Sequence, residues 1–189
     1  MSWKNRKISN LAEEYWKTKN HPHRKQIINI LRKLQPWSSL LEIGCNCGMN
    51  LSLIDKKFKG RDLRGTDINK EALDFAKKKL PNVKFFQGEI EDAITFGEND
   101  IILIDAVLLY VSDKDIEKAI KRITHSAKKA IILCEWYDKD KLGVIKEEHW
   151  ARNYPELFKD FGWKCRMKNV IWPESKIWQI YGQIIIATK

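Results

Sequence analysis

Apolar residues recur along the chain at two spacings, one typical of amphipathic helices and one typical of buried strands. Ile27, Ile30, Leu31 and Leu34 fall at i, i+3, i+4 and i+7, which predicts a helix that ends before Pro36. Elsewhere apolar residues form short, nearly unbroken runs, as in strands covered on both faces. The predicted helices are 27–34, 49–58, 70–80, 116–123 and 154–161, and the predicted strands are 38–43, 62–66, 83–87, 100–105, 130–134, 163–170 and 178–188.

Helices and strands alternate through most of the chain. This alternation predicts an α/β fold in which a parallel sheet carries helices on both faces. The 189 residues are enough for one domain with a substantial core and too few for two ordinary ones. The sequence shows no internal repeat, low-complexity tract or linker. We therefore expect a single domain, with residues 1–35 as a helical lid or cap and residues 36–189 as the core.

The segment 41–50, Leu-Glu-Ile-Gly-Cys-Asn-Cys-Gly-Met-Asn, joins a predicted strand to a predicted helix. Gly44 and Gly48 permit a tight turn and leave room for a ligand against the main chain. The turn differs from the dinucleotide fingerprint G-x-G-x-x-G, because Asn46 replaces the middle glycine and the last glycine comes one residue early. No G-K-[ST] follows, as it would in a phosphate-binding loop. The turn therefore suits a ligand without a pyrophosphate.

Two acidic residues stand at the ends of the next two predicted strands. Asp67 is placed to accept hydrogen bonds from both hydroxyls of a ribose, and Glu89 is placed to meet an adenine amino group. The alternative for Asp67 is that it merely caps the helix that follows. Asn69, two residues later, also has a residue type that is typical of an N-cap. The glycine turn and the two acids, at successive strand ends, together favour a nucleoside site.

These motifs, in their order, resemble the class I S-adenosylmethionine-dependent methyltransferases. The segments that carry the resemblance are 41–50, 65–69, 88–90 and 100–111, and it extends from about residue 36 to residue 189. It implies a Rossmann-like, doubly wound, mostly parallel seven-stranded sheet with an antiparallel C-terminal strand. It also implies S-adenosylmethionine as cofactor and S-adenosylhomocysteine as product. The cofactor-binding positions implied are Glu42, Gly44, Cys45, Asn46, Gly48, Asp67, Ile68, Gly88, Glu89, Ile90, Asp105 and Ala106.

The segment before the core has two interpretations. Tyr15, Trp16, His23 and Arg24 precede the glycine turn and would form a lid over the cofactor, with Tyr15 and Arg24 contacting it. The rival interpretation is a packed N-terminal helix with Trp16 in the core. The sequence does not decide between the two.

The residues after the fourth predicted strand bear on the acceptor. The tetrad [DNS]-P-P-[YFW] of nucleic-acid amino methyltransferases is missing at 105–108, and no cysteine stands near that strand as a 5-methylcytosine nucleophile. The segment 107–113 instead resembles small-molecule methyltransferases, and 44–51 with 134–137 resembles methylases of bacterial surface-sugar and pseudaminic acid pathways. We therefore expect methyl transfer to O or N of a small, sugar-like acceptor. The candidate catalytic residues are His149, Tyr110 and Glu135.

The charge keeps a second function open. The formal net charge is +10, which fits either solvated surface lysines or attraction to nucleic acid. The alternatives are thus an rRNA- or tRNA-directed methyltransferase, or a cofactor-binding homologue without catalysis. Cys45, Cys47, Cys134 and Cys165 show no disulfide or zinc spacing, so we expect buried thiols and no metal. No signal peptide or membrane span is predicted, which suggests a cytoplasmic protein without a membrane partner.

Overall fold

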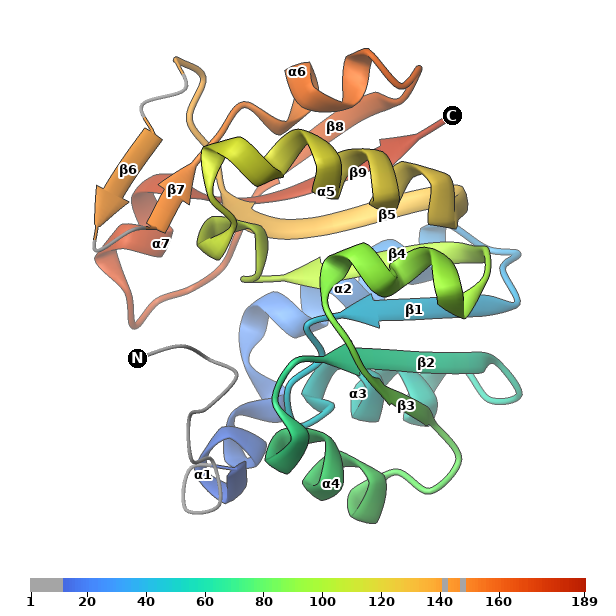
Figure 1. Ribbon diagram of the computed structural model, residues 1–189. Coiled ribbons are helices and arrows are strands. Elements are labelled where there is room, and N and C mark those ends of the chain that lie inside the picture. Colours follow the sequence, from blue (N-terminus) through green and yellow to red (C-terminus); the bar gives the residue numbers. More distant parts are fainter. Residues whose placement is uncertain (1–11, 141–142, 147–148) are drawn as a thin grey trace.

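A central sheet of seven strands organises the molecule in the computed structural model, which describes residues 12–140, 143–146 and 149–189. The strand order is β3-β2-β1-β4-β5-β9-β8, and β1 to β5 are parallel to one another (Figure 1). The last strand, β9, is antiparallel to both of its neighbours. The predicted fold, a mostly parallel seven-stranded Rossmann-like sheet with an antiparallel C-terminal strand, is confirmed. The strands are β1 Ser39–Ile43, β2 Asp62–Asp67, β3 Lys84–Gln87, β4 Asn99–Asp105, β5 Ala127–Trp136, β8 Lys164–Asn169 and β9 Gly182–Thr188.

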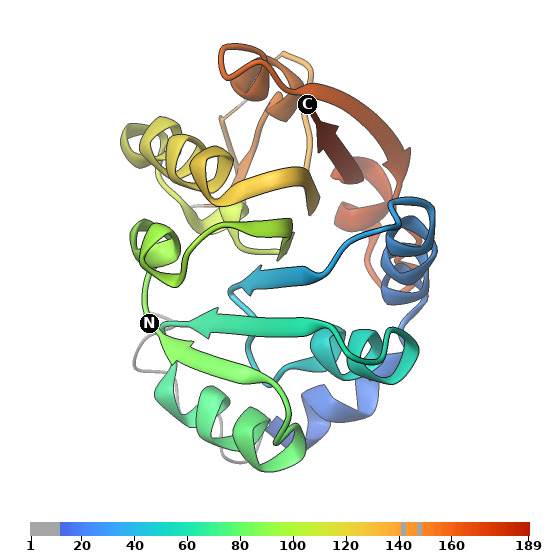
Figure 2. The ribbon, with the colours of Figure 1, turned by 90° about the vertical axis from the view of Figure 1, so that its right-hand side faces the viewer.

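Helices cover both faces of the sheet, as Figure 2 shows. One face packs against α2 and α3, and the opposite face packs against α5 and α6. No described helix is long and apolar enough to cross a membrane. The helical elements are α1 Ala12–Lys17, η2 Thr18–Asn20, α2 Pro22–Lys33, α3 Met49–Lys57, α4 Lys70–Lys79, η3 Ile90–Phe96, η4 Leu108–Tyr110, α5 Asp113–Ser126, α6 Tyr154–Lys159 and α7 Lys176–Tyr181.

The two cores arise from the alternation of side chains along the buried strands. In β4, Ile101 and Leu103 face one core while Ile102 and Ile104 face the other, and all four side chains are fully buried. Because both faces are covered, the strand is apolar at successive positions rather than at every second one. This is the reason that the unbroken apolar runs in the sequence predicted the central strands.

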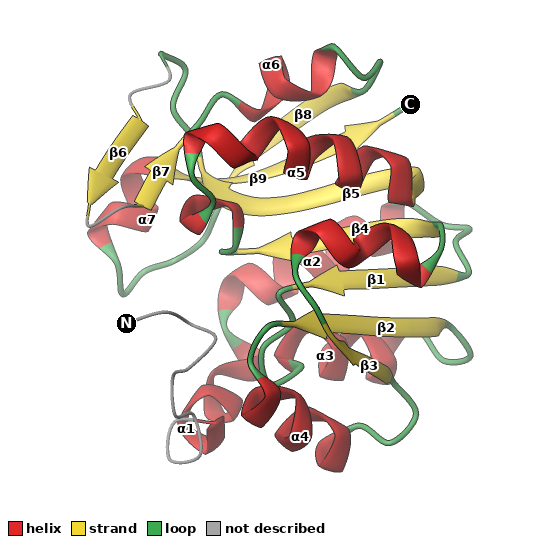
Figure 3. Cartoon of the chain, viewed as in Figure 1, coloured by secondary structure: helices red, strands yellow, loops and turns green. Residues whose placement is uncertain are grey.

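The predicted final strand 178–188 is wrong at its start, because residues up to Tyr181 belong to helix α7 (Figure 3). Its sequence, Lys-Ile-Trp-Gln-Ile-Tyr, is rich in residues that favour strands. Packing overrides this preference, since the buried Trp178 ring stacks on Trp172 at 4.4 Å between centroids. The antiparallel pair β6 Gly143–Lys146 and β7 His149–Ala151 also lies apart from the main sheet and was not predicted.

Candidate cofactor and acceptor site

The carboxyl ends of β1, β2 and β4 meet at one edge of the sheet, and α1 and α7 lie beyond that edge (Figure 1). A pocket of about 1220 Å³ opens there. This exceeds the roughly 300–1,000 Å³ of a typical site for one small ligand, so the pocket has room for a cofactor and an acceptor. It lies where doubly wound sheets bind their ligands.

The glycine turn forms one wall of the pocket. Gly44 has φ +73° and Asn46 has φ +47°, both left-handed. Asparagine tolerates this conformation better than most residues, so Asn46 takes a backbone angle that a glycine would otherwise supply. Gly48 does not line the pocket, contrary to the prediction. Its φ is +77° and a Cβ there would come within 3.0–3.4 Å of Leu80 and Ala76, so this glycine serves packing against α4.

Asp67 ends β2 and joins the turn to the start of α4. Its Oδ2 accepts the backbone N–H of Asn46 at 2.8 Å, and its Oδ1 accepts the N–H of Asn69 at 2.8 Å. Burial raises the pKa of Asp67 above its usual value, although these N–H groups oppose the rise. The helix cap itself is Asn69, whose side chain accepts the N–H of Ala72. Asp67 therefore lines the pocket with a carboxylate that is not the N-cap of α4.

The floor of the pocket gathers three polar side chains from β1, α3 and β4. Asn50 donates through Nδ2 to Glu42 Oε1 at 2.7 Å and to Asp105 Oδ2 at 2.9 Å. Glu42 Oε2, Asn50 Oδ1 and Asp105 Oδ1 are buried and have no hydrogen-bond partner among the described residues. Unpaired buried oxygens are costly, and a proton on Glu42 can pair at most two of these three atoms, so the floor indicates a missing donor, such as a cationic group of a ligand.

The two acids on this floor differ in protonation. Burial raises the pKa of Glu42 to about 8, and the neighbouring Asp105 adds to the rise. Burial also raises the pKa of Asp105, but attraction to His23 and the hydrogen bond from it outweigh burial and leave that pKa below the usual range. At neutral pH the floor therefore holds one carboxylate at Asp105 and a largely protonated acid at Glu42.

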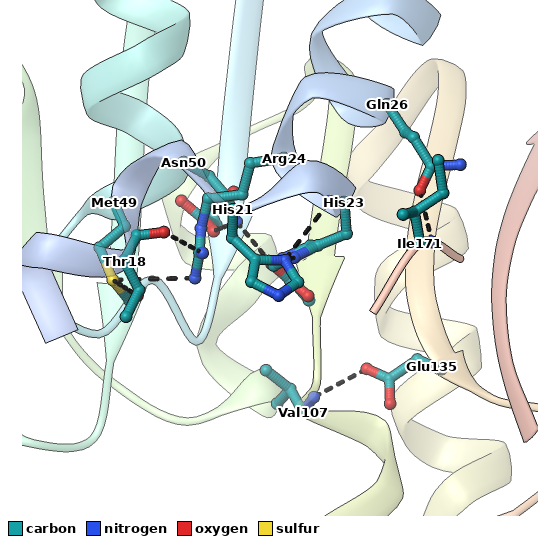
Figure 4. Close-up of polar contacts among 12 residues, drawn as sticks. Thr18, His21, His23, Arg24, Gln26, Met49, Asn50, Val107, Glu135 and Ile171 are labelled. Atoms are coloured by element: carbon teal, nitrogen blue, oxygen red, sulfur yellow. Dashed lines mark hydrogen bonds and ion pairs between the residues drawn. The ribbon is translucent and has the colours of Figure 1, made fainter. Parts of the chain in front are cut away.

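Arg24 also lines the pocket, close enough to these acids for its charge to lower the pKa of both. Its guanidinium donates to the carbonyl of Thr18 at 2.8 Å and contacts the sulfur of Met49 at 3.7 Å (Figure 4). The side chain is buried, and its Nε has no partner among the described residues. Tyr15 lines the same side. Trp16 packs edge-on against Phe75 of α4, so the N-terminal segment both covers the pocket and packs against the core.

The η4 turn after β4 is held by two buried polar side chains, Glu135 and Arg152. Glu135 accepts the backbone N–H groups of Val107, Leu108 and Leu109 at 2.7, 2.9 and 3.1 Å. Arg152 donates to the carbonyl of Leu108 at 2.9 Å and to that of Val111. Glu135 is fully buried and does not line the pocket, so the structure does not place it beside the other predicted catalytic residues. Its two oxygens accept three backbone N–H groups that fix the turn.

Aromatic rings form the wall opposite the glycine turn. Tyr110 meets His149 edge-on at 4.6 Å between ring centroids, and His149 lies 5.7 Å from Trp136. Trp172 and Trp178 continue this wall. The sequence predicted Tyr110 and His149 here, but not the tryptophans or His21, because these come from segments far apart in the chain.

Most of the predicted site residues share the one pocket. Among the described residues, the predicted ones that line it are Tyr15, Arg24, Glu42, Gly44, Cys45, Asn46, Asp67, Ile68, Gly88, Glu89, Ile90, Asp105, Ala106, Tyr110 and His149. Gly48 and Glu135 do not. No cluster of three or more metal-ligating side chains occurs in the described parts of the chain.

Part of the chain is similar in sequence to known methyltransferases. Residues 40–130 match a family described as a methyltransferase domain. A ribosomal protein L11 methyltransferase from Dictyoglomus turgidum is 35% identical over 86 residues, which are 45% of this chain and 26% of that protein. The chain thus spans about a quarter of the length of this curated relative.

Solved structures share the fold at low sequence identity. Streptomyces venezuelae DesVI superimposes with a TM-score of 0.74 at 11% identity, over 97% of this chain and 99% of that one. The magnesium protoporphyrin IX methyltransferase from Synechocystis, solved with S-adenosylhomocysteine, gives 0.69 at 16% identity, over 92% and 86%. About half of the chain thus matches a methyltransferase domain family, and the chain shares its fold with solved methyltransferases, one of them with bound S-adenosylhomocysteine.

Proposed function

We propose that the protein transfers a methyl group from S-adenosylmethionine to an oxygen or nitrogen atom of a small acceptor. The observation that carries this proposal is the set of buried acceptor atoms without partners on Glu42, Asn50 and Asp105. The ammonium of the methionine moiety supplies the donor that these atoms lack, while the guanidinium of Arg24 suits the carboxylate of the same moiety. Few other ligands carry both groups next to a nucleoside.

The other end of the pocket suits the nucleoside. Asp67 lines the pocket, and its two oxygens offer about four acceptor sites, of which the turn uses part, so the carboxylate can also accept a ribose hydroxyl. Glu89 and Ile90 follow β3 and line the pocket beside it. We assign the adenine to these two residues.

S-adenosylmethionine supplies an activated methyl group on its sulfonium. The protein's own contribution is to hold the acceptor in line with the bond that breaks and to exclude water from it. Asp105 and Ala106, at the end of β4, border the acceptor side of the pocket. Ala106 has φ +59°, a strained conformation that is typical of positions fixed for function.

The acceptor wall supports a small, partly apolar acceptor. Tyr110, Trp136 and His149 offer rings to the flat face of a sugar or another compact molecule, and they leave polar atoms at their edges. A sugar-like acceptor fits this wall and fits the resemblance to surface-sugar methylases.

Calorimetric binding of S-adenosylhomocysteine tests the cofactor site. We expect micromolar binding by the wild type and a loss of about 10- to 100-fold in Asp67→Ala, since hydrogen bonds to a charged group contribute about 1.5–3 kcal/mol. The control is Asp74→Ala, which removes an exposed carboxylate that pairs only with Lys70 on α4. Thermal unfolding of each variant checks that the fold survives. If the folded wild type does not bind S-adenosylhomocysteine, the proposed function is wrong.

A nucleic-acid acceptor is the second candidate. The formal net charge of +10 favours it. Filter retention of total tRNA at two salt concentrations separates the candidates, because phosphate contacts weaken steeply with salt. Retention of tRNA at about 50 mM salt that falls steeply at about 200 mM salt would favour RNA, whereas no retention at either concentration would favour the small acceptor.

A further inference from the structure

Basic residues are concentrated in two segments that meet near the pocket. Residues 21–37 contain four lysines and arginines and no acidic residue, and residues 162–189 contain five and one acidic residue, Glu174. The two segments are in contact, because Gln26 of α2 donates to the carbonyl of Asn169 at 3.0 Å and accepts the N–H of Ile171 at 2.7 Å (Figure 4). Most of the formal net charge of +10 therefore comes from this one region.

Three of these cations lie on the elements that meet there. Lys25 is near the start of α2, Lys168 is near the end of β8, and Lys176 begins α7. Lys168 stands opposite Ile184 of β9, whose side chain packs in the same core as α2, so Lys168 lies on the α2 face of the sheet. All three lysines are exposed, and none forms an ion pair with another described residue. The acidic residue of the region, Glu174, is already paired with the histidine that caps α2.

Two exposed isoleucines accompany these lysines. Ile180 is 69% exposed and Ile171 is 51% exposed, and they are the two most exposed large apolar residues in the described parts of the chain. Ile171 precedes Trp172 and Ile180 follows two residues after Trp178, and the rings of these tryptophans are stacked at 4.4 Å. Both isoleucines therefore belong to one compact connection between β8 and β9, residues 170–181. Exposed apolar residues that are rimmed by polar ones are typical of interaction sites.

The β8–β9 connection has a side that faces the pocket and a side that faces outward. It projects beyond the sheet at the edge where the pocket opens (Figure 1). Trp172 and Trp178 line the pocket, whereas Ile171 and Ile180 do not. The outward side thus combines exposed aliphatic side chains with lysines, next to the mouth of the pocket.

We propose that the surface formed by Lys25, Lys168, Ile171, Lys176 and Ile180 docks the protein on a membrane that carries anionic lipids. The isoleucines enter the boundary between headgroups and acyl chains, and the lysines contact the lipid phosphates. The mouth of the pocket then lies beside the headgroups. This inference goes beyond the proposed function and does not depend on the methyl acceptor. The sequence predicted no membrane partner because it contains no span, but a surface that lies on a bilayer needs none.

The aliphatic residues favour a bilayer over a nucleic acid as the partner of this docking surface. Proteins that bind single-stranded nucleic acids combine basic residues with aromatic rings on which the bases stack. In the β8–β9 connection the tryptophan rings are stacked on each other and line the pocket. The side chains that the connection exposes beside its lysines are isoleucines, which suit the acyl boundary of a membrane.

Co-sedimentation with vesicles tests the docking surface in the full chain. We expect the wild type to bind vesicles of phosphatidylcholine mixed with phosphatidylglycerol, and not vesicles of phosphatidylcholine alone. Lys168→Gln combined with Lys176→Gln should weaken this binding about 10- to 30-fold, since each cation near an anionic bilayer contributes about a factor of five. The matched control is Lys77→Gln combined with Lys78→Gln. It removes the same charge from exposed positions on α4, which packs against β3 at the opposite edge of the sheet, and should weaken binding by less than about threefold.

A second pair of substitutions tests the apolar part of the surface. Ile171→Ser combined with Ile180→Ser leaves the charge unchanged and should weaken vesicle binding about tenfold or more, because it removes the side chains that enter the acyl boundary. Thermal unfolding checks the fold of each variant. None of the substituted residues lines the pocket, so binding of S-adenosylhomocysteine remains a separate test of the proposed function.

Three results would overturn the docking surface. The folded wild type would not bind the mixed vesicles, the two lysine pairs would weaken binding equally, or the isoleucine variant would bind as well as the wild type. Retention of tRNA that is lost in the Lys168 and Lys176 variant, without any vesicle binding, would assign the surface to a nucleic acid instead.

Discussion

Gly44 and Gly60 have the same left-handed backbone conformation but different surroundings. Their φ angles are +73° and +75°. A Cβ on Gly44 would lie 2.3 Å from Cγ2 of Val107, whereas a Cβ on Gly60 would meet nothing within 4 Å. Gly60→Ala should therefore cost only the conformational strain, about 1 kcal/mol of unfolding free energy. Gly44→Ala should cost about 1–3 kcal/mol more, because it also overpacks the turn against η4.

Urea unfolding of the two glycine variants measures the difference directly. Equal losses in the two would show that Val107 moves aside freely and that the turn is not tightly packed against the segment after β4.

Glu42 should release a proton when the cofactor product binds. Its pKa is raised to about 8 by burial, so at pH 7 the acid is mostly protonated. An ammonium beside it favours the carboxylate, so binding of S-adenosylhomocysteine lowers this pKa and releases up to about one proton. Affinity should accordingly rise as the pH rises from 7 toward 8.

Calorimetry in two buffers with different ionisation enthalpies detects this proton. Glu42→Gln has no proton to release at this position, so the difference between wild type and variant isolates the contribution of Glu42 from that of the other titratable groups. A wild-type binding heat that does not depend on the buffer would contradict the assignment of the ammonium to Glu42.

At the scale of the element, η4 depends on groups outside itself. A three-residue turn has few internal hydrogen bonds, and Glu135 and Arg152 supply partners from β5 and from the residue after β7. Glu135→Gln replaces one accepting oxygen with a donating amide that faces backbone N–H groups. We expect a loss of about 2 kcal/mol or more in unfolding free energy at pH 7. Glu156→Gln, at an exposed pair with Lys159, should change stability by less than about 0.5 kcal/mol. A similar loss in both variants would mean that Glu135 does not anchor the turn.

The elements that the sequence predicted are those whose burial is visible in the local pattern. β4 reads as an apolar run because both of its faces are covered, and Asn69 caps α4 through a contact with Ala72, three residues away. α7 was missed because its β-branched and aromatic residues follow strand preferences, and only contact with Trp172 from a distant segment makes it helical. The β6–β7 pair is too short to give a periodic signal.

The site residues likewise divide into those that the local sequence pattern reveals and those that depend on distant segments. Asp67 and Glu89 were predicted because each lies at or just after the end of a strand, and parallel strand ends meet at one edge, whereas Glu42 was predicted from the resemblance alone. Glu135 was predicted beside the pocket because an acid at a strand end looks the same in sequence whether it faces a pocket or a turn. The place of His21 beside the pocket could not be predicted from the local sequence, since its side chain contacts Glu174, 153 residues away.

At the scale of the whole molecule, the pocket is assembled from both ends of the chain around the strand edge. α1 and η2 contribute Tyr15 and Thr18, and the segment before α7 contributes Trp172 and Glu174. Short helices and loops of this kind have low local stability, so a ligand that contacts them should order them. α6 lies on the opposite core face and does not line the pocket.

Binding of S-adenosylhomocysteine should therefore slow amide hydrogen exchange in some elements and not in others. We expect slower exchange in α1, η2 and the Trp172–Trp178 segment, and no change in α6. Because the ligand binds only the folded state, a concentration 100 times its Kd should add about 2.7 kcal/mol of stability and raise the Tm by about 5–10 °C. Protection confined to the glycine turn would mean that the N- and C-terminal segments take no part in binding.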